Sequence, residues 1–260
     1  MKKITIDPIT RLEGHGKIEI YLDEQGNCDR ACLQIPELRG FEQFAIGRPA
    51  EEMPRITSMI CGVCPTAHHM AAAKALDDLF KVEPTPTAKK IRQIMYNAFQ
   101  AEDHILHFYF LGGPDFVVGP QAPAGERNIL GVIAKAGLET GKKVIQMRKG
   151  MRNVIRIIGG KPVMPSCALP GGVSKGINKD EQQTIIEAAE YAVEFCKMSL
   201  DIFNEIVLKN KDYVDLITGD IYAHETYYMG MVDDNNKVNF YEGSLRVVDP
   251  EGRAAAPCGQ

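Results

Sequence analysis

The sequence predicts an α+β fold, in which N-terminal antiparallel strands are followed by a bundle of mostly long helices. Three short runs with alternating apolar residues, separated by turn residues, precede residue 38. Between about residues 65 and 208 the apolar residues recur at helical spacing, over stretches longer than a strand. We therefore expect one domain, with a β-rich part at 1–38, a helical bundle at 39–235, and a small hairpin and tail at 236–260.

The expected strands lie at residues 4–6, 17–22 and 31–35. In the second strand Ile18, Ile20 and Leu22 alternate with other residues, which is the period of a strand with one covered face. The segment 23–27 is rich in turn-forming residues and connects the last two strands. This arrangement predicts an antiparallel sheet.

The first long helix is expected at residues 65–80, where an Ala-rich run follows Pro65. A second begins at Thr85-Pro86, a cap followed by proline in the first turn, and runs towards residue 111. We expect the Gly-Gly-Pro at 112–114 to stop it.

A third long helix is expected over residues 126–158, despite its internal glycines, with an end at Gly159-Gly160. The Pro/Gly-rich segment 161–176 leads to the last long helix, which continues to about residue 208. Asn178 and Glu181 have the spacing of a capping box at its start. Residues 238–248 are expected to form the hairpin.

Composition excludes several classes of protein. Apolar residues make up 45% and charged residues 25% of the 260 residues, and the net charge is −4, so we expect no nucleic-acid partner. No run of about 18 apolar residues occurs, so we expect no membrane span. The N-terminus does not have the pattern of a signal peptide. Seven irregularly spaced cysteines argue against a disulfide framework, and together these features predict a cytoplasmic protein.

The clearest indication of a functional site is a pair of cysteines at residues 60–69. This segment reads Ile60-Cys61-Gly62-Val63-Cys64-Pro65-Thr66-Ala67-His68-His69. Two cysteines separated by two residues can bind one metal from the same side of a turn, and a helix N-terminus favours the thiolate. No second Cys-x-x-Cys is present, so the pair is half of a metal site. The alternatives are two buried thiols and a thioredoxin-like dithiol. The strand-like run at 56–60 is the reason to consider the dithiol, but the chain lacks the βαβ alternation that a thioredoxin-like fold needs.

Spacing assigns other residues to structural roles. Of His68 and His69 we expect one to be solvated and one to lie in the core. His104 and His107 share a helical face, for which core polar packing is favoured over metal binding. Burial is also favoured for four further cysteines, namely Cys28, Cys32, Cys167 and Cys196. Glu13, in a Gly-flanked turn, is an ordinary surface acid on this evidence.

Several motifs, in the same order, resemble those of nickel–iron hydrogenase large subunits. The chain is most similar to the F420-non-reducing (viologen-reducing) type, which is cytoplasmic and works with heterodisulfide reductase. The motifs cover nearly the whole chain and lie at 7–15 (Asp-Pro-Ile-Thr-Arg-Leu-Glu-Gly-His), 39–42 (Arg-Gly-Phe-Glu), 60–69, 101–108, 159–162 and 169–173.

The resemblance implies roles for individual residues. Cys61 would be a terminal nickel ligand, and Cys64 would bridge nickel and iron. Glu13 would carry protons to and from the site, and His68 would support Cys64. Glu42 would help to hold a magnesium ion or a similar cation.

The implied reaction is the reversible heterolytic cleavage of H2, at a Ni-Fe centre whose iron holds carbon monoxide and cyanide. Electrons would leave through iron–sulfur clusters of a small partner subunit, towards an acceptor complex of the heterodisulfide reductase type.

Three features differ from the pattern of the family. The second cysteine pair is absent, and we interpret Cys258 as a coincidence rather than a remnant of it, so the chain is expected to be C-terminally truncated. Met59 stands where an arginine is usual, and Met164 where a histidine is usual. A chain lacking the rest of the bundle should expose apolar surface.

Two further functions compete with the hydrogenase interpretation. A non-catalytic docking subunit would keep the fold without the metal site, which the missing pair and the two methionines favour. The related quinone-site subunit of complex I generally lacks the nickel-binding cysteines, so Cys61 and Cys64 count against it.

Overall fold

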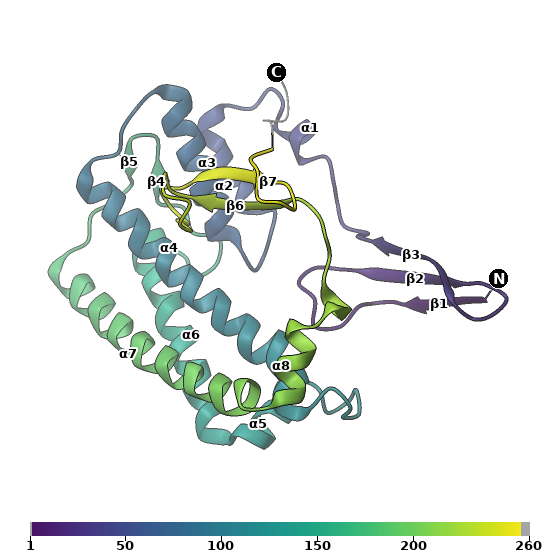
Figure 1. The fold of residues 1–260 in the computed structure, drawn as a ribbon. Coiled ribbons are helices and arrows are strands. Elements are labelled where there is room, and N and C mark those ends of the chain that lie inside the picture. The colour runs from purple at the N-terminus through teal and green to yellow at the C-terminus, as the bar shows by residue number, and fades with distance from the viewer. Residues whose placement is uncertain (1, 256–260) are drawn as a thin grey trace. The chain divides into compact units, whose positions relative to one another are not determined.

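The computed structural model describes residues 2–255, the side chain of Tyr222 excepted (Figure 1). The chain divides into two compact units, Met1–Ser199 and Leu200–Gln260. The predicted cysteine motif and all expected site residues belong to the first unit. Cys258 lies outside the described residues.

The N-terminal sheet is antiparallel, as predicted. It consists of β1 (Lys2–Ile6), β2 (Lys17–Leu22) and β3 (Cys28–Gln34), in the order β1-β2-β3. Ile20 pairs with Ile4 on one side and with Ala31 on the other. The turn after β2 forms because Asp23 Oδ1 accepts hydrogen bonds from the backbone amides of Gln25 and Asn27.

The segment before the cysteine pair is helical, which corrects the expectation of a strand-like run at 56–60. It contains α1 (Phe41–Ala45), the 3-10 turn η1 (Ala50–Glu52) and α2 (Met53–Thr57). Pro54 lies in the first turn of α2, where its missing N–H costs nothing. With no strand before the pair, the thioredoxin-like alternative loses its structural support.

The helix α3 (Pro65–Phe80) has the predicted bounds. In α4 (Pro86–Leu106) the Thr85 side chain accepts a hydrogen bond from the amide of Ala88, so the predicted cap is confirmed. The predicted stop at 112–114 is wrong. Helical structure continues as two π-helical segments, η2 (His107–Gly112) and η3 (Pro114–Val118), because Gly113 keeps a helical φ of −54°.

The expected helix at 126–158 is two helices, α5 (Ile129–Ala136) and α6 (Leu138–Gly159). Gly137, with φ 90° and ψ 150°, separates them, and this backbone conformation suits glycine. Gly160 ends α6 with φ 78°, as expected.

The segment after α6 forms a small hairpin of β4 (Ala168–Leu169) and β5 (Gly172–Val173). The helix α7 (Lys179–Phe203) follows and ends in the π-helical η4 (Asn204–Leu208). The predicted capping box is present, since Asn178 Oδ1 accepts from the Glu181 amide and a Glu181 carboxylate oxygen accepts from the Asn178 amide.

The core of the first unit lies where α4 packs against α6. Met95 of α4 and Met147 of α6 are fully buried, and Phe195 of α7 is buried as well. Arg92 is also fully buried, and it reaches Asp77 of α3 and the carbonyls of Leu169 and Gly172. This buried arginine joins α3, α4 and the β4–β5 hairpin.

The second unit contains the end of α7, η4, α8 (Lys211–Thr218), the 3-10 turn η5 (Asp220–Tyr222), β6 (Tyr228–Val232) and β7 (Ser244–Val248). The two strands form an antiparallel hairpin in which Tyr228 pairs with Val248. The predicted hairpin at 238–248 therefore omitted its first strand. Among residues 2–255, no helix combines the length and apolar character needed to cross a bilayer.

Candidate metal centre

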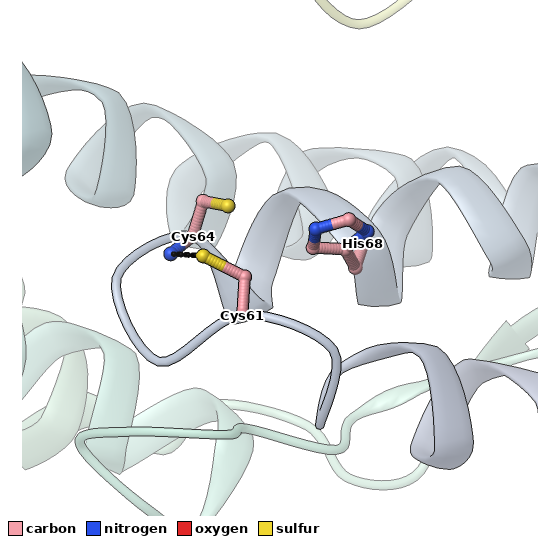
Figure 2. Close-up of side chains that lie close together, drawn as sticks. All are labelled: Cys61, Cys64 and His68. Atoms are coloured by element: carbon pink, nitrogen blue, oxygen red, sulfur yellow. Dashed lines mark hydrogen bonds between the residues drawn. The ribbon is translucent and has the colours of Figure 1, made fainter. Parts of the chain in front are cut away.

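The two cysteines of the motif lie at the turn that leads into α3. Cys64 is the residue immediately before the helix, and Pro65 is its first residue. The backbone amide of Cys64 donates a hydrogen bond to Cys61 Sγ over 3.2 Å. The bond bends the turn so that both sulfur atoms face the same space (Figure 2).

His68 completes a group of three metal-binding side chains. One helical turn after Cys64, it places a ring nitrogen so that its ligand atom and the two sulfurs lie within 4.8 Å of one another. All three residues are half-buried. Figure 2 shows their side chains close together at the start of α3. Two thiols and an imidazole within this distance suit a soft or borderline transition metal, so the residues present fit a nickel–iron group.

Glu13 approaches this group from the turn between β1 and β2. Its Oε1 atom lies 3.6 Å from Cys61 Sγ, which donates the hydrogen bond. Residues separated by 48 positions in the sequence are thus in contact. The carboxylate is placed to exchange a proton with this sulfur.

A cavity of about 460 Å³ opens beside the cysteines. Cys64, Glu13, Asp103 and His107 supply its polar lining, and its apolar lining comes from Leu12, Val63, Leu106 and Leu111. Burial raises the pKa of Asp103 above the ordinary value of an aspartic acid. Asp103 was not singled out from the sequence, although it lies four residues before His107 on the helical segment that forms this wall.

The Cys64 thiol has a pKa raised to about 12. The largest cause is burial, and the hydrogen bond and charge of Cys61 and the charges of Glu13 and Asp103 add to it. Burial and these neighbours therefore oppose the influence of the helix N-terminus, which favours the thiolate.

His69 has a structural role, and it is the core member of the histidine pair. It is fully buried, and its Nδ1 lies 2.9 Å from the carbonyl oxygen of Pro54. Its Nε2 accepts hydrogen bonds from the amides of Cys167 and Ala168, at 3.1 and 3.0 Å. Because Nε2 accepts from two N–H groups, the proton of the neutral ring must be on Nδ1.

The structure does not bring every expected residue to the centre. Glu42 is exposed in the first turn of α1 and is not part of the three-residue group. His104 and His107 are exposed, so core packing was wrong for both. His104 contacts the Gln100 carbonyl of its own helix, whereas His107 lines the cavity.

The cysteines outside the motif differ in burial. Cys167 is buried, as expected, but Cys28 is exposed, and Cys32 and Cys196 are intermediate. The burial expected for Cys28 is therefore wrong, because β3 is an edge strand whose residues are mostly exposed. Of the two methionines that differ from the family pattern, Met59 is 55% exposed and Met164 is half-buried.

Comparison with known proteins agrees with the fold and the motif. Residues 39–126 match the family model described as nickel-dependent hydrogenase, and residues 3–38 match the one described as HoxL-like. The chain is 49% identical to an F420-non-reducing hydrogenase iron-sulfur subunit of Archaeoglobus profundus, over 97% of this chain and 52% of that protein. It is 43% identical to an F420-non-reducing hydrogenase vhu subunit of Methanocaldococcus jannaschii, over 97% of this chain and 59% of that protein.

A solved structure of an NAD+-reducing [NiFe]-hydrogenase in the H2-reduced state has a TM-score of 0.88 with this chain at 32% identity. The superposition covers 99% of this chain and 56% of the other. The chain is thus similar to nickel-dependent hydrogenases in sequence, and its fold is like that of part of their large subunits. It spans about half the length of the curated relatives that it matches.

Proposed function

We propose that this chain contributes the N-terminal half of a nickel–iron site for the reversible heterolytic cleavage of H2. One observation carries the proposal. In a chain similar to nickel-dependent hydrogenases, Cys61, Cys64 and His68 are grouped within 4.8 Å, and the Glu13 carboxylate lies 3.6 Å from the Cys61 sulfur.

In this proposal Cys61 and Cys64 would hold the nickel–iron group, Cys61 as a ligand of nickel alone and Cys64 as a ligand shared by nickel and iron. His68, one turn along α3 from Cys64, supports the bridging sulfur. The Cys64 thiol must lose its proton when the metals bind, because the thiolate is the ligand. The remaining ligands, which would include carbon monoxide and cyanide on iron, would come from outside this chain's cysteine pair.

When bound, the Ni-Fe centre supplies Lewis acidity that makes H2 acidic enough to be cleaved. The chain's own residues would then move the proton. Cys61 Sγ can hold it and pass it to Glu13 Oε1 along the contact of 3.6 Å.

Electrons would leave through the iron–sulfur clusters of a small partner subunit, and from there reach an acceptor complex of the heterodisulfide reductase type. Support for this is indirect, from the naming of the relatives as subunits. The magnesium role of Glu42 has little support, because its exposed carboxylate stands in no group of three or more potential ligands among the described residues.

The test is the nickel and iron content of the assembled protein, purified without oxygen from the organism that makes it. We expect near-stoichiometric nickel. Cys61→Ala should lose both nickel and H2 uptake, whereas the control Cys28→Ala, at an exposed cysteine on β3, should keep both. Nickel retained by Cys61→Ala would contradict the assignment of the ligand.

A wild-type assembly that carries partner iron but no nickel would instead support the non-catalytic docking subunit. That function would keep the fold and the association with an iron–sulfur subunit. H2 uptake would then be absent from wild type and from both variants alike.

A further inference from the structure

The turn that carries Glu13 is attached to the helical unit through Arg11. Arg11 Nη1 lies 2.7 Å from Asp115 Oδ2 and Nη2 lies 2.8 Å from Oδ1, so the two residues form a bidentate ion pair. Arg11 Nη1 also donates to the carbonyl oxygen of Leu111 over 2.8 Å. Three directional bonds thus fix a side chain two residues away from Glu13.

The backbone of Arg11 has an unusual conformation that its surroundings must maintain. Its φ of 55° lies in the left-handed region, which is unfavourable for a residue with a Cβ. A residue that keeps this conformation must be held there by its surroundings. The bonds of the guanidinium to Asp115 and Leu111 provide that constraint.

One acceptor of Arg11 belongs to the wall of the metal-site cavity. Leu111 lies in η2 and Asp115 in η3, the two π-helical segments that follow α4. Leu111 lines the cavity that Glu13 and Cys64 also line, whereas Asp115 does not. Arg11 therefore links the turn of Glu13 to a helical segment that lines the same cavity.

The other side of Glu13 is held as well. The amide of His15 donates to Glu37 Oε1 over 2.8 Å, and the amide of Ile9 donates to the carbonyl of Gly16 over 2.8 Å. A Cβ at position 16 would come within 2.6 Å of Leu12 Cδ2, so the turn is closely packed there. Glu13 therefore lies between two residues that are hydrogen-bonded to other segments, namely Arg11 through its side chain and His15 through its backbone amide.

The ion pair stays charged at neutral pH. Burial alone would raise the pKa of Asp115, but the hydrogen bonds and charges of Arg11 and Arg127 outweigh it and lower the pKa. Arg127 makes one contact with the same carboxylate, Nη1 to Oδ1 at 3.2 Å, from the segment before α5. It shares Asp115 but is not part of the turn of Glu13.

We propose that Arg11 is a positioning residue, which holds the Glu13 carboxylate within reach of the Cys61 sulfur through Asp115 and Leu111. The inference rests on the proposed function of Glu13 in proton transfer. Small displacements of a transferring group are costly, since about 1 Å can lower a rate roughly 100-fold.

The test compares Arg11→Lys with the control Arg127→Lys in the assembled protein. Lysine keeps the charge but cannot form the bidentate pair. For Arg11→Lys we expect nickel content as in wild type, with the exchange of H2 with D2O slowed about 100-fold. Arg127→Lys should stay within a few-fold of wild type, and Asp115→Asn should reproduce the defect of Arg11→Lys.

Two measurements separate positioning from a general loss of stability. In a double-mutant cycle, Arg11→Lys should add no further loss to Glu13→Gln, whereas fully additive losses would overturn the inference. Amide hydrogen exchange of residues 11–16 should accelerate at least tenfold in Arg11→Lys and not in Arg127→Lys. If the amides of residues 11–16 exchanged as slowly in Arg11→Lys as in wild type, the inference would also be overturned.

The amide measurement does not require the metals. If the wild-type assembly holds no nickel, the proposed function fails, and amide exchange still decides whether Arg11 holds the turn. If nickel and H2 activity are present but Arg11→Lys exchanges H2 at the wild-type rate, the proposed function stands and this inference fails.

Discussion

Cys64 is subject to two opposing influences on its thiol. Its place before the first residue of α3 favours the thiolate, because the helix dipole is positive there. Burial, with the neighbouring Cys61, Glu13 and Asp103, favours the protonated form and raises the pKa to about 12. A metal that binds here must therefore displace a proton, so metal uptake should become easier as pH rises.

In the metal-free chain we expect Cys64 to remain a thiol at neutral pH and to react slowly with iodoacetamide. The rate should keep rising with pH towards the pKa of about 12, because the reactive species is the thiolate. Mass spectrometry of the peptide that contains Cys64 measures it. A rate that reaches its plateau below pH 9 would show that the thiolate forms without the metal.

His69 joins three segments through one buried ring, since it contacts Pro54 of α2 and the amides of Cys167 and Ala168. His69→Ala would leave two buried N–H groups without this acceptor, and we expect a loss of about 3 kcal/mol in the free energy of unfolding. Denaturant titration measures it. The control His104→Ala, at an exposed site, should change stability by less than about 0.5 kcal/mol.

The N-terminal sheet is held partly by charges rather than by apolar packing. Glu19, in the central strand β2, is only 7% exposed and is paired with Lys3 at 2.9 Å and Lys17 at 3.0 Å. Hydrogen bonds from Lys3, Lys17 and Tyr21 lower the pKa of Glu19 from 4.5 to about 2. The ionised carboxylate is thus favoured by folding.

This lowered pKa predicts a dependence of stability on pH. The contribution of Glu19 is present in full above pH 4.5 and is lost as the pH falls towards 2, because the unfolded chain then binds the proton first. Thermal unfolding midpoints of wild type should fall more steeply across this window than those of Glu19→Gln. If the unfolding midpoints of wild type and Glu19→Gln fell equally steeply with pH, the ion pairs of Glu19 with Lys3 and Lys17 would not persist in solution. Glu24→Gln, in the turn, is the control.

The helix boundaries show what local patterns can and cannot predict. Capping residues such as Thr85 and Asn178 are recognisable in the sequence because their hydrogen bonds involve residues three positions away. The break between α5 and α6 is not, because Gly131, Gly137 and Gly141 look alike in the sequence. Only Gly137 has positive φ, whereas a Cβ at Gly141 would meet Ile133 at 3.1 Å, where α5 and α6 pack closely.

Large apolar side chains are exposed in both compact units. In the first unit Leu38 is 80% and Leu130 72% exposed, and in the second unit Met229 is 72% exposed. The chain spans about half the length of the relative from Archaeoglobus profundus. Exposed apolar surface of this kind favours association.

We therefore expect the purified chain alone to self-associate or to need a partner for solubility. Sedimentation velocity between low and high micromolar concentration, with and without an iron–sulfur partner subunit, measures this. Association should decrease when the partner is present. A single monomeric species that unfolds cooperatively at every concentration would contradict the expectation.

The sequence alone predicted the strands of the first sheet, the bounds of α3, the capping residues and the Cys61/Cys64 pair. Each depends on residues within a few positions of one another, where period, turn chemistry and spacing act directly. The contact of Glu13 with Cys61, the cavity wall with Asp103 and the attachment of Arg11 to Asp115 required the folded chain. The two contacts join residues 48 and 104 positions apart, and the raised pKa of Cys64 likewise depends on burial. Contacts and burial of that kind arise from packing, which no local pattern encodes.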